Sequence, residues 1–232
     1  MKYQHSSFSD QGPYSENQDS LRVSLTHDDL CIACIADGVG SENCGQQAAQ
    51  FATQFFVETL EINPSSELLK VANAVNADLL NRPKQGFVTT FTGVVIKGYE
   101  LLGIHAGDTR VCLLRANGIK QLTEDHTEYL RLIKAGKLTP EEAVTYPRKH
   151  VLESALGTMA EPQLDTFGFE LQNGDRVLLM TDGVHNLMSK RELRDISKAN
   201  QNVHDFVSDV VVRIKEIKPS DNYSLIAIEI TQ

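Results

Sequence analysis

The order of apolar segments in this chain predicts an α+β fold in which two sheets are covered by helices. Residues 19–25 alternate between apolar and polar side chains, as in a strand with one buried face. Residues 30–36 are apolar throughout, and residues 176–180 repeat this arrangement, as in strands buried on both faces. Pairs of helical segments separate these strands. The chain has 232 residues, 41% hydrophobic and 23% charged, so we expect a single domain over residues 1–232.

Two helices are expected after the first buried strand. Residues 45–60 repeat apolar side chains at helical spacing, namely Ala48, Phe51, Ala52 and Phe55. Asn63-Pro64 is typical of a helix start, because asparagine caps helices and proline suits the first turn. The second helix is therefore expected to begin there, with an inward stripe made of Leu68, Ala72, Val75 and Leu79.

Further strands are expected in the middle of the chain. Residues 91–97 form one strand, and residues 101–115 hold two strands' worth of apolar sequence around Gly107-Asp108. Asn117-Gly118 then predicts a hairpin turn, because asparagine and glycine tolerate the backbone angles of tight turns.

The polar composition of the segment from about residue 128 to 150 predicts a short helical insertion. It contains Thr139-Pro140-Glu141-Glu142, a capping box with proline at the first helical position. A second capping box, Ser189-Lys190-Arg191-Glu192, opens another helix. Residues 203–217 form the last helix, whose inward side chains are Phe206, Val207, Val210, Val211 and Ile214.

Four aspartates lie at the edges of apolar runs beside glycine or asparagine. They are Asp37-Gly38, Asp108, Asp182-Gly183 and Asp221-Asn222. Strand ends hold side chains rigidly, and glycine lets backbone carbonyls approach a ligand closely. Gathered carboxylates repel one another and take up protons unless a cation neutralises them. Taken singly, each aspartate is also typical of an ordinary turn. Together they predict a metal site, and oxygen ligands favour Mg²⁺ or Mn²⁺ over Zn²⁺.

The charge distribution argues against two classes of partner. The formal net charge is -9, and no block of lysine or arginine suggests binding to nucleic acid or to an anionic membrane. No apolar run approaches the roughly 20 residues that span a bilayer, and the first residues lack the pattern of a secretory signal. We therefore expect a cytoplasmic protein with no membrane partner.

The pair Cys31 and Cys34 has the CxxC spacing found in some zinc and redox sites. It lies inside an apolar strand, and Cys44 and Cys112 do not supply the second close pair of a structural zinc site. We interpret the pair as small buried apolar residues.

Six short motifs follow one another along nearly the whole chain. The first three are Asn17-Gln18-Asp19, Asp37-Gly38-Val39-Gly40 and Gly86-Phe87-Val88-Thr89-Thr90. The others are Gly107-Asp108-Thr109-Arg110 with Leu122-Thr123-Glu124-Asp125-His126, Thr181-Asp182-Gly183-Val184, and Asp221-Asn222-Tyr223-Ser224. In this order and spacing they resemble the metal-dependent Ser/Thr protein phosphatases of type 2C, in their short bacterial form. Each motif alone is weak, but the set is specific.

The resemblance implies a four-layer α-β-β-α sandwich of two antiparallel sheets, with a mobile flap at residues 128–150 beside the active site. It implies hydrolysis of phosphoserine and phosphothreonine in proteins by direct attack of a metal-bound hydroxide. The partner would be a phosphorylated protein, and the activity would oppose a Ser/Thr kinase. Residues 131–149 either contact this substrate or form a solvated helical hairpin. We expect a monomer.

The resemblance also implies roles for individual residues. Asp37, Asp182 and Asp221 would hold one ion. A second ion would be held by Asp37, the Gly38 carbonyl and Asp19, the last directly or through water. Asp108 becomes a candidate ligand, with Asp182, for a third and weaker ion. Asn222 would orient Asp221 from outside the metal's own ligands.

The chemistry needs no catalytic side chain, because the water on the metal supplies the nucleophile. A divalent cation can lower the pKa of bound water from 15.7 to about 7, and two cations can clamp phosphate and nucleophile. Signatures of other phosphatase classes are absent, since no cysteine precedes an arginine by six positions and no Asp-x-Asp occurs. A GxxxxGK(S/T) nucleotide-binding loop is absent as well.

Two positions depart from the family's pattern. Tyr14 stands where most members have an arginine that grips phosphate, so Tyr14 is a candidate phosphate contact of lower affinity unless Arg22 or Lys2 reaches in. Val39 stands where some members have a histidine proposed as general acid, so the proton must come from metal-bound water or another residue. A pseudophosphatase that binds phosphoproteins as a scaffold is therefore an alternative, against which the retained aspartates argue.

Three further side chains are interpreted as structural. His105 lies within a strand and is expected to be packed and hydrogen-bonded. His126 is expected to anchor the base of the flap. Arg110 is expected to brace Asp108 within the fold.

Overall fold

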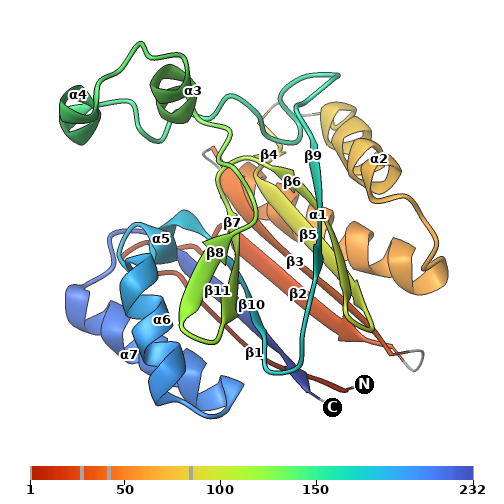
Figure 1. Ribbon diagram of the computed structural model, residues 1–232. Coiled ribbons are helices and arrows are strands. Elements are labelled where there is room, and N and C mark those ends of the chain that lie inside the picture. The colour runs from red at the N-terminus through yellow and green to blue at the C-terminus, as the bar shows by residue number, and fades with distance from the viewer. Residues whose placement is uncertain (1, 27–28, 41–42, 84–85, 232) are drawn as a thin grey trace.

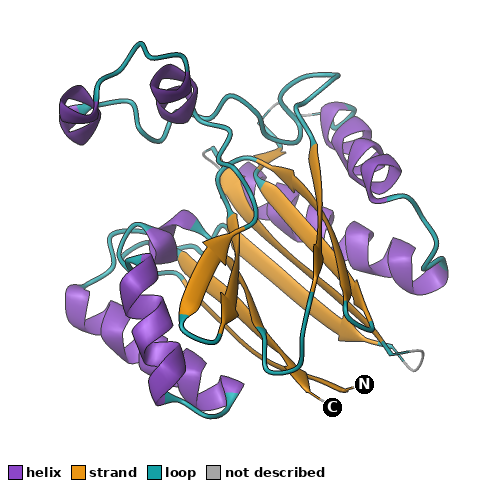
Figure 2. Cartoon of the chain, in the orientation of Figure 1, coloured by secondary structure: helices purple, strands orange, loops and turns teal. Residues whose placement is uncertain are grey.

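The computed structural model describes residues 2–26, 29–40, 43–83 and 86–231. These residues form two antiparallel sheets that pack face to face, with helices on both outer sides (Figure 1). Figure 2 shows the strands in the middle of the molecule and the helices around them. The α-β-β-α sandwich is therefore confirmed. The two ends of the chain lie side by side, because Lys2 pairs with Thr231.

One sheet has the strand order β1-β11-β10-β7-β8. Its strands are β1 (Lys2–Asp10), β7 (Arg110–Arg115), β8 (Gly118–Gln121), β10 (Arg176–Met180) and β11 (Tyr223–Thr231). The other sheet has the order β2-β3-β5-β6-β9. Its strands are β2 (Asp19–Leu25), β3 (Leu30–Val39), β5 (Phe91–Lys97), β6 (Glu100–Ala106) and β9 (Asp165–Glu170). The short strand β4 (Val88–Thr89) pairs with the end of β3.

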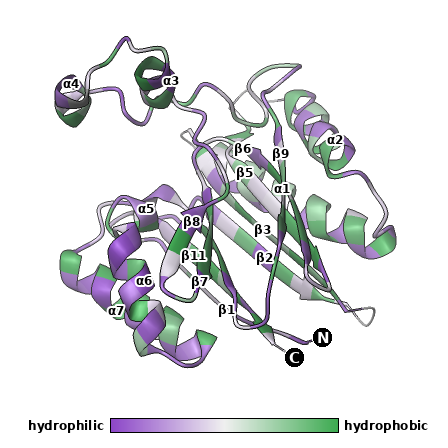
Figure 3. Ribbon diagram, in the orientation of Figure 1, coloured by the Kyte–Doolittle hydropathy of each residue, from purple (hydrophilic) through white to green (hydrophobic). Residues whose placement is uncertain are grey.

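Helices cover the outer face of each sheet (Figure 1). On the sheet that contains β3 these are α1 (Cys44–Ile62) and α2 (Leu68–Leu80). On the other sheet they are α5 (Asp182–His185), α6 (Lys190–Ala199) and α7 (Val203–Ile217). The insertion predicted at residues 128–150 contains α3 (Glu128–Lys134) and α4 (Pro140–Thr145), which stand apart from both sheets. In Figure 3 the strands carry both apolar and polar colours, and much of the outward helix surface is polar.

Residues 30–36 of β3 are all apolar because each face of the strand packs into a separate core. The side chains that point between the sheets are Cys31, Ala33 and Ile35. Those that pack against α1 and α2 are Ile32, Cys34 and Ala36. The strand buried on both faces is confirmed, and so is the interpretation of the cysteines: neither Cys31 nor Cys34 forms a disulfide, and burial raises the pKa of both thiols.

The start of the second helix was predicted wrongly. α2 begins at Leu68, and Asn63 instead closes α1, since its N–H donates to the carbonyl oxygen of Thr59 at 2.9 Å. The Asn63 side chain accepts a hydrogen bond from the N–H of Ser65 at 3.3 Å. Asn63-Pro64 therefore forms the turn between the helices, which asparagine and proline suit as well as they suit a helix start.

The expected strand pairs near the middle of the chain are present. Arg115 pairs with Gly118 across β7 and β8, so the hairpin turn consists of Ala116 and Asn117, one position earlier than expected. β6 and β7 flank Gly107-Asp108, but they belong to different sheets. Residues 107–109 therefore carry the chain from one sheet to the other, and Asp108 lies at that crossing.

Both predicted capping boxes are confirmed. The hydroxyl of Thr139 accepts a hydrogen bond from the N–H of Glu142 at the start of α4, and Ser189 makes the same contact with Glu192 at the start of α6. Among the described residues, no helix is both long enough and apolar enough to cross a bilayer.

Candidate metal centre

A cavity of about 440 Å³ opens where segments from both sheets meet. Its acidic lining comes from the end of β3, the crossing between β6 and β7, the start of α5 and the turn before β11. The aspartates that line it are Asp37, Asp108, Asp182 and Asp221, and Glu16 lines it as well. Four aspartates that the sequence singled out therefore face one space. Gly38 lines it too.

Asp19 approaches this group from β2. It pairs with Asp37 across the β2–β3 ladder and is buried. Its Oδ2 accepts a hydrogen bond from the hydroxyl of Thr181 at 2.9 Å, whereas its Oδ1 is buried without a hydrogen-bond partner. An unpartnered buried carboxylate oxygen is costly, and a cation or an ordered water would satisfy it.

Two glycines allow the segments around the cavity to approach closely. A Cβ on Gly38 would lie 2.2 Å from the carbonyl carbon of Gly45, so the end of β3 can touch the first turn of α1 only without side chains there. A Cβ on Gly183 would lie 1.9 Å from the carbonyl oxygen of Asn222. The second contact brings together the neighbouring residues Asp182 and Asp221.

The grouped carboxylates favour protonation when no cation is bound. Burial, with the charges of Asp182 and Asp221, raises the pKa of Asp19 to about 7. Burial and the charge of Asp182 raise the pKa of Asp108 to about 7. Burial, followed by the charges of the other four carboxylates, raises the pKa of Asp37 well above its usual range. Burial and the charge of Asp221 also raise the pKa of Asp182. A bound cation would remove this repulsion.

The donor set fits an oxygen-bound divalent cation. In the part of the chain that the structure describes, no three His, Cys, Asp or Glu side chains gather closely enough to enclose an ion by themselves. Mg²⁺ usually takes one or two carboxylates and keeps several waters, and Mn²⁺ prefers the same oxygen ligands. The fit therefore rests on the shared cavity, the raised carboxylate pKa values and the unpartnered Oδ1 of Asp19.

Asn222 contacts Asp221, as expected, and it does so through its backbone. Its backbone N–H, rather than its amide group, donates to Oδ1 of Asp221 at 2.8 Å. The side chain holds the segment before β2: its Oδ1 accepts from the N–H of Gln18 at 2.8 Å, and its Nδ2 donates to the carbonyl oxygens of Gln11 and Glu16. The Asn222 side chain thus positions the segment that contains Tyr14.

Tyr14 lines the cavity, with 53% of its surface exposed. The two cations considered as substitutes for the missing arginine lie elsewhere. Arg22 lines a different cavity, together with Glu58 and Glu61. Lys2 pairs with Thr231, at the opposite end of β11 from the candidate metal centre.

Arg110 does not brace Asp108, contrary to the expectation. Its Nε donates to Oδ1 and Oδ2 of Asp125 at 2.9 and 3.1 Å. The β7–β8 hairpin folds the chain back and brings Asp125 beside Arg110, a contact that the local sequence does not reveal. Arg110 affects Asp108 through its charge, which lowers the pKa of that carboxyl against the effect of burial.

His105 is the packed histidine that the sequence predicts. Its Nδ1 lies 2.7 Å from Oγ1 of Thr92, and its Nε2 lies 3.0 Å from the carbonyl oxygen of Glu124. Burial, with the neighbouring His126, lowers the pKa of His105 to about 4. The ring is therefore neutral at physiological pH and its nitrogens are occupied.

His126 connects the chain crossing to the 128–150 segment. Its Nδ1 accepts a hydrogen bond from the N–H of Gly107 at 3.2 Å, and its Nε2 lies 3.1 Å from Oδ2 of Asp165. Its carbonyl oxygen accepts from the N–H of Glu153 at 2.8 Å. This geometry agrees with an anchor at the base of the insertion.

The structure adds His150, which the sequence analysis did not select. It ends the 128–150 segment and lines the cavity, with its Nδ1 3.9 Å from Oδ2 of Asp182. Among the described residues that line the cavity, it supplies the basic side chain. Its contact with Asp182 joins distant parts of the chain, so the sequence could not show it. The one sequence feature that could have indicated His150 is its position at the end of the flap.

Comparisons with known proteins agree with this geometry. A family model described as protein phosphatase 2C matches residues 13–216. Serine/threonine phosphatase stp of Listeria welshimeri is 28% identical over 226 residues, which cover 92% of this chain and 90% of that protein. Protein phosphatase PhpP of Streptococcus pneumoniae is 31% identical over 194 residues, 78% of each chain. The catalytic domain of serine threonine protein phosphatase PstP, solved in complex with 2 manganese ions, is 25% identical, with a TM-score of 0.82 and 99% of each chain covered.

Proposed function

Because this chain belongs to the protein phosphatase 2C family of serine/threonine protein phosphatases, we propose that it hydrolyses phosphoserine and phosphothreonine in proteins with bound Mn²⁺ or Mg²⁺. The relative that was solved with manganese supports this choice of ion. The substrate is then a phosphorylated protein produced by a Ser/Thr kinase. We further propose that the protein acts as a cytoplasmic monomer.

One observation carries the proposal: aspartates from both sheets converge on one cavity, and burial with their mutual repulsion raises the pKa values of Asp37, Asp108 and Asp182. A protein that only binds phosphoproteins has no chemical need for so many converging carboxylates. Divalent cations, by contrast, require them.

The proposed ligands follow the arrangement around the cavity. Asp37, Asp182 and Asp221 would hold one ion. Asp37, the carbonyl of Gly38 and Asp19 would hold the other, with Asp19 bound directly or through water. Asp108 and Asp182 would hold a third and weaker ion. Such ions would lower the pKa of water enough for attack on phosphorus at neutral pH and would neutralise charge on the phosphate.

The protein's own side chains orient this group. The hydroxyl of Thr181 fixes Oδ2 of Asp19, which leaves Oδ1 free for a ligand. The backbone N–H of Asn222 fixes Asp221. Tyr14 and His150 line the same cavity and can donate hydrogen bonds to phosphate oxygens. The 128–150 segment, which ends at His150, is proposed as a flap over the substrate.

The direct test is hydrolysis of p-nitrophenyl phosphate and of a phosphothreonine peptide, with Mn²⁺ titrated from a chelated start. Asp182→Asn should abolish the metal-dependent turnover without unfolding the protein. The matched control is Asp209→Asn on α7, which removes an exposed carboxylate away from the cavity and should retain full activity. Full activity of Asp182→Asn would contradict the proposal.

The absence of arginine and lysine among the described lining residues supports one second candidate, a scaffold that binds phosphoproteins without turnover. The same titration separates the two functions. Mn²⁺ binding that is lost in Asp182→Asn, with no hydrolysis of either substrate by the unmodified protein, would favour the scaffold.

A further inference from the structure

We propose that an apolar groove beside the cavity binds an apolar side chain of the phosphoprotein substrate, one or two positions from the phosphorylated residue. This inference rests on the proposed function, because it assigns a sequence preference to the same site. The groove has a volume of about 310 Å³. Its apolar lining includes Val39, Val88, Leu152, Ala155 and Met159. The volume lies at the lower end of the range for ligand pockets, which suits one or two side chains.

The groove is continuous with the cavity. Val39, His150 and Leu152 line both of them. Val39 follows Asp37 by two positions on β3, and a strand advances about 3.3 Å per residue, so their Cα atoms are about 7 Å apart. An extended peptide advances by the same amount. A side chain one or two positions from a phosphorylated residue in the cavity can therefore enter the groove.

Paired backbone segments hold the floor of the groove in place. Val39 pairs with Val88 where β4 joins the end of β3. The next residue, Thr89, exchanges two backbone hydrogen bonds with Leu156, at 3.1 and 2.9 Å. The side chains of Val39 and Val88 thus project from hydrogen-bonded strands, which hold them in place as a specificity pocket requires.

Apart from His150, which also lines the cavity, the polar side chains along the groove are already paired within the protein. The hydroxyl of Ser154 donates to a backbone carbonyl at 2.9 Å, and the hydroxyl of Thr158 donates to another at 2.7 Å. Glu153 pairs with Arg131 of α3. Because these groups are satisfied, the surface left for a partner is apolar. An acidic side chain placed there, away from His150, would lose its water without gaining a hydrogen bond.

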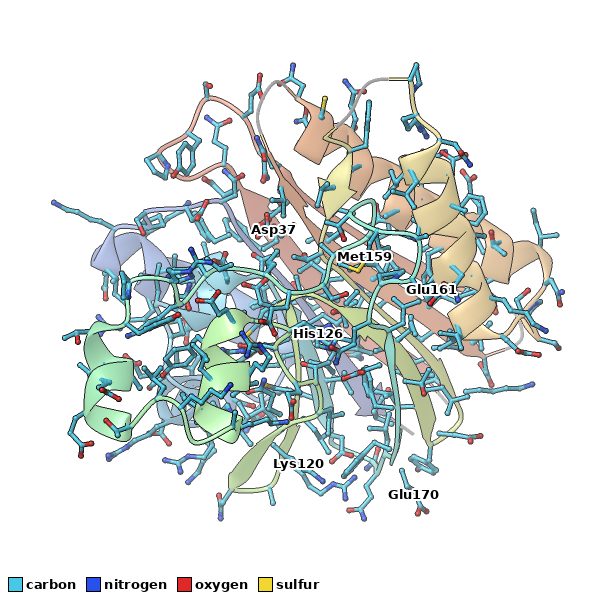
Figure 4. All side chains as sticks on the ribbon, turned by 90° about the horizontal axis from the view of Figure 1, so that it is seen from above. Asp37, Lys120, His126, Met159, Glu161 and Glu170 are labelled. Atoms are coloured by element: carbon cyan, nitrogen blue, oxygen red, sulfur yellow. The ribbon has the colours of Figure 1, made fainter. Side chains whose placement is uncertain are left out.

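Apolar surface is exposed on both sides of the groove. Val39 is 38% exposed and Met159 is 46% exposed. Figure 4 labels Asp37 on β3 and Met159 on the loop before β9, both near the middle of the view from above. Single exposed apolar residues are common on protein surfaces. Here Val39 lines the cavity that has to receive a protein segment, and Met159 lines the groove that adjoins it. That continuity identifies the substrate as the occupant.

The test compares phosphothreonine peptides that differ at one flanking position, with Leu or Asp placed in turn at the two positions on each side. Turnover and peptide affinity are both measured in the presence of Mn²⁺, the affinity by fluorescence anisotropy. At one position or two, Leu should raise kcat/KM and affinity about tenfold over Asp, as expected for an apolar pocket.

Met159→Lys should reverse this preference at the same position, because its ammonium group can pair with Asp. The matched control is Val212→Lys on α7, where a residue with 55% exposure lies away from the groove. This control should keep the preference for Leu. The rate on p-nitrophenyl phosphate, which has no flanking residues, monitors the metal centre in each variant.

Equal kcat/KM and affinity for all peptide pairs would overturn the inference, as would a Leu preference that Met159→Lys leaves unchanged. Failure of the proposed function gives a different result, namely no turnover of p-nitrophenyl phosphate or of any peptide. In that case the peptide affinities still decide whether the groove binds an apolar side chain.

Discussion

The hydroxyl of Thr181 donates a hydrogen bond to Oδ2 of Asp19 at 2.9 Å. Thr181 follows β10 in one sheet and Asp19 begins β2 in the other, so this bond joins the two sheets at the candidate metal centre. Oγ1 of Thr181 also accepts from the N–H of Ser224 at 3.0 Å. All three residues are buried, so water cannot readily replace either bond.

Thr181→Val should lower both the free energy of unfolding and the affinity for Mn²⁺. Valine has nearly the same shape, but it leaves Asp19 and the N–H of Ser224 without this partner. An unpaired buried polar group costs about 1–3 kcal/mol. Urea unfolding and calorimetric titration with Mn²⁺ measure the two effects. Thr181→Ser keeps the hydroxyl and serves as the control, so identical results for Val and Ser would show that the bond has no such role.

The metal-free protein should lose stability, relative to Asp108→Asn, as the pH rises from about 4 to about 7. Asp108 titrates near pH 3.9 in an unfolded chain, whereas burial raises its pKa to about 7 in the fold. Between these values the folded state binds more protons than the unfolded state. The free energy of unfolding therefore decreases with rising pH, and the decrease ends above the folded-state pKa.

Urea unfolding in chelator at several pH values between about 5 and 8 measures this trend. Subtracting the values for Asp108→Asn removes the contributions to stability that both proteins share, including those of His105 and His185. Burial lowers the pKa of each of these histidines to about 4, so they act in the opposite direction below about pH 6.5. If the free energy of unfolding of the unmodified protein rose with pH relative to that of Asp108→Asn, the result would contradict the raised pKa of Asp108. Saturating Mn²⁺ should stabilise the protein more at higher pH, because metal binding requires deprotonated carboxylates.

Tyr14→Arg should lower the KM for a phosphothreonine peptide about tenfold. A guanidinium group can donate two charge-assisted hydrogen bonds to phosphate, whereas the phenol donates one and carries no charge. Steady-state kinetics measure the change, and Tyr14→Phe isolates the contribution of the hydroxyl. An unchanged KM in Tyr14→Arg would mean that another residue already binds the phosphate, with His150 the first to examine.

His150→Asn should lower kcat/KM for the phosphothreonine peptide about a hundredfold, and for p-nitrophenyl phosphate much less. An imidazole placed beside the phosphate can give a proton to the leaving alkoxide, which is a poor leaving group, whereas nitrophenolate leaves without a proton. His204→Asn removes an exposed histidine on α7 and is the matched control. Equal losses on both substrates would assign His150 to phosphate binding instead of proton transfer.

Elements with a strong local pattern were predicted correctly. β3 lies between two cores because its alternate residues are apolar on both faces, and Thr139 and Ser189 begin their helices as their capping boxes indicate. The prediction at Asn63-Pro64 was wrong because the same pair suits a turn after one helix as well as the start of the next. The prediction for Arg110 was wrong because its contact with Asp125 depends on how the β7–β8 hairpin folds the chain back.

Local sequence patterns predicted most of the strands and helices, although not β1 or β9, and placed aspartates beside strand ends. Those features depend on neighbours within a few positions, through side-chain periodicity, capping and turn preference. The folded structure was needed to show that Thr181 contacts Asp19, that His150 approaches Asp182 and that the apolar groove adjoins the cavity. These contacts join distant parts of the chain, and their distances follow from strand pairing and from the packing of two sheets, which spacing along the sequence does not specify.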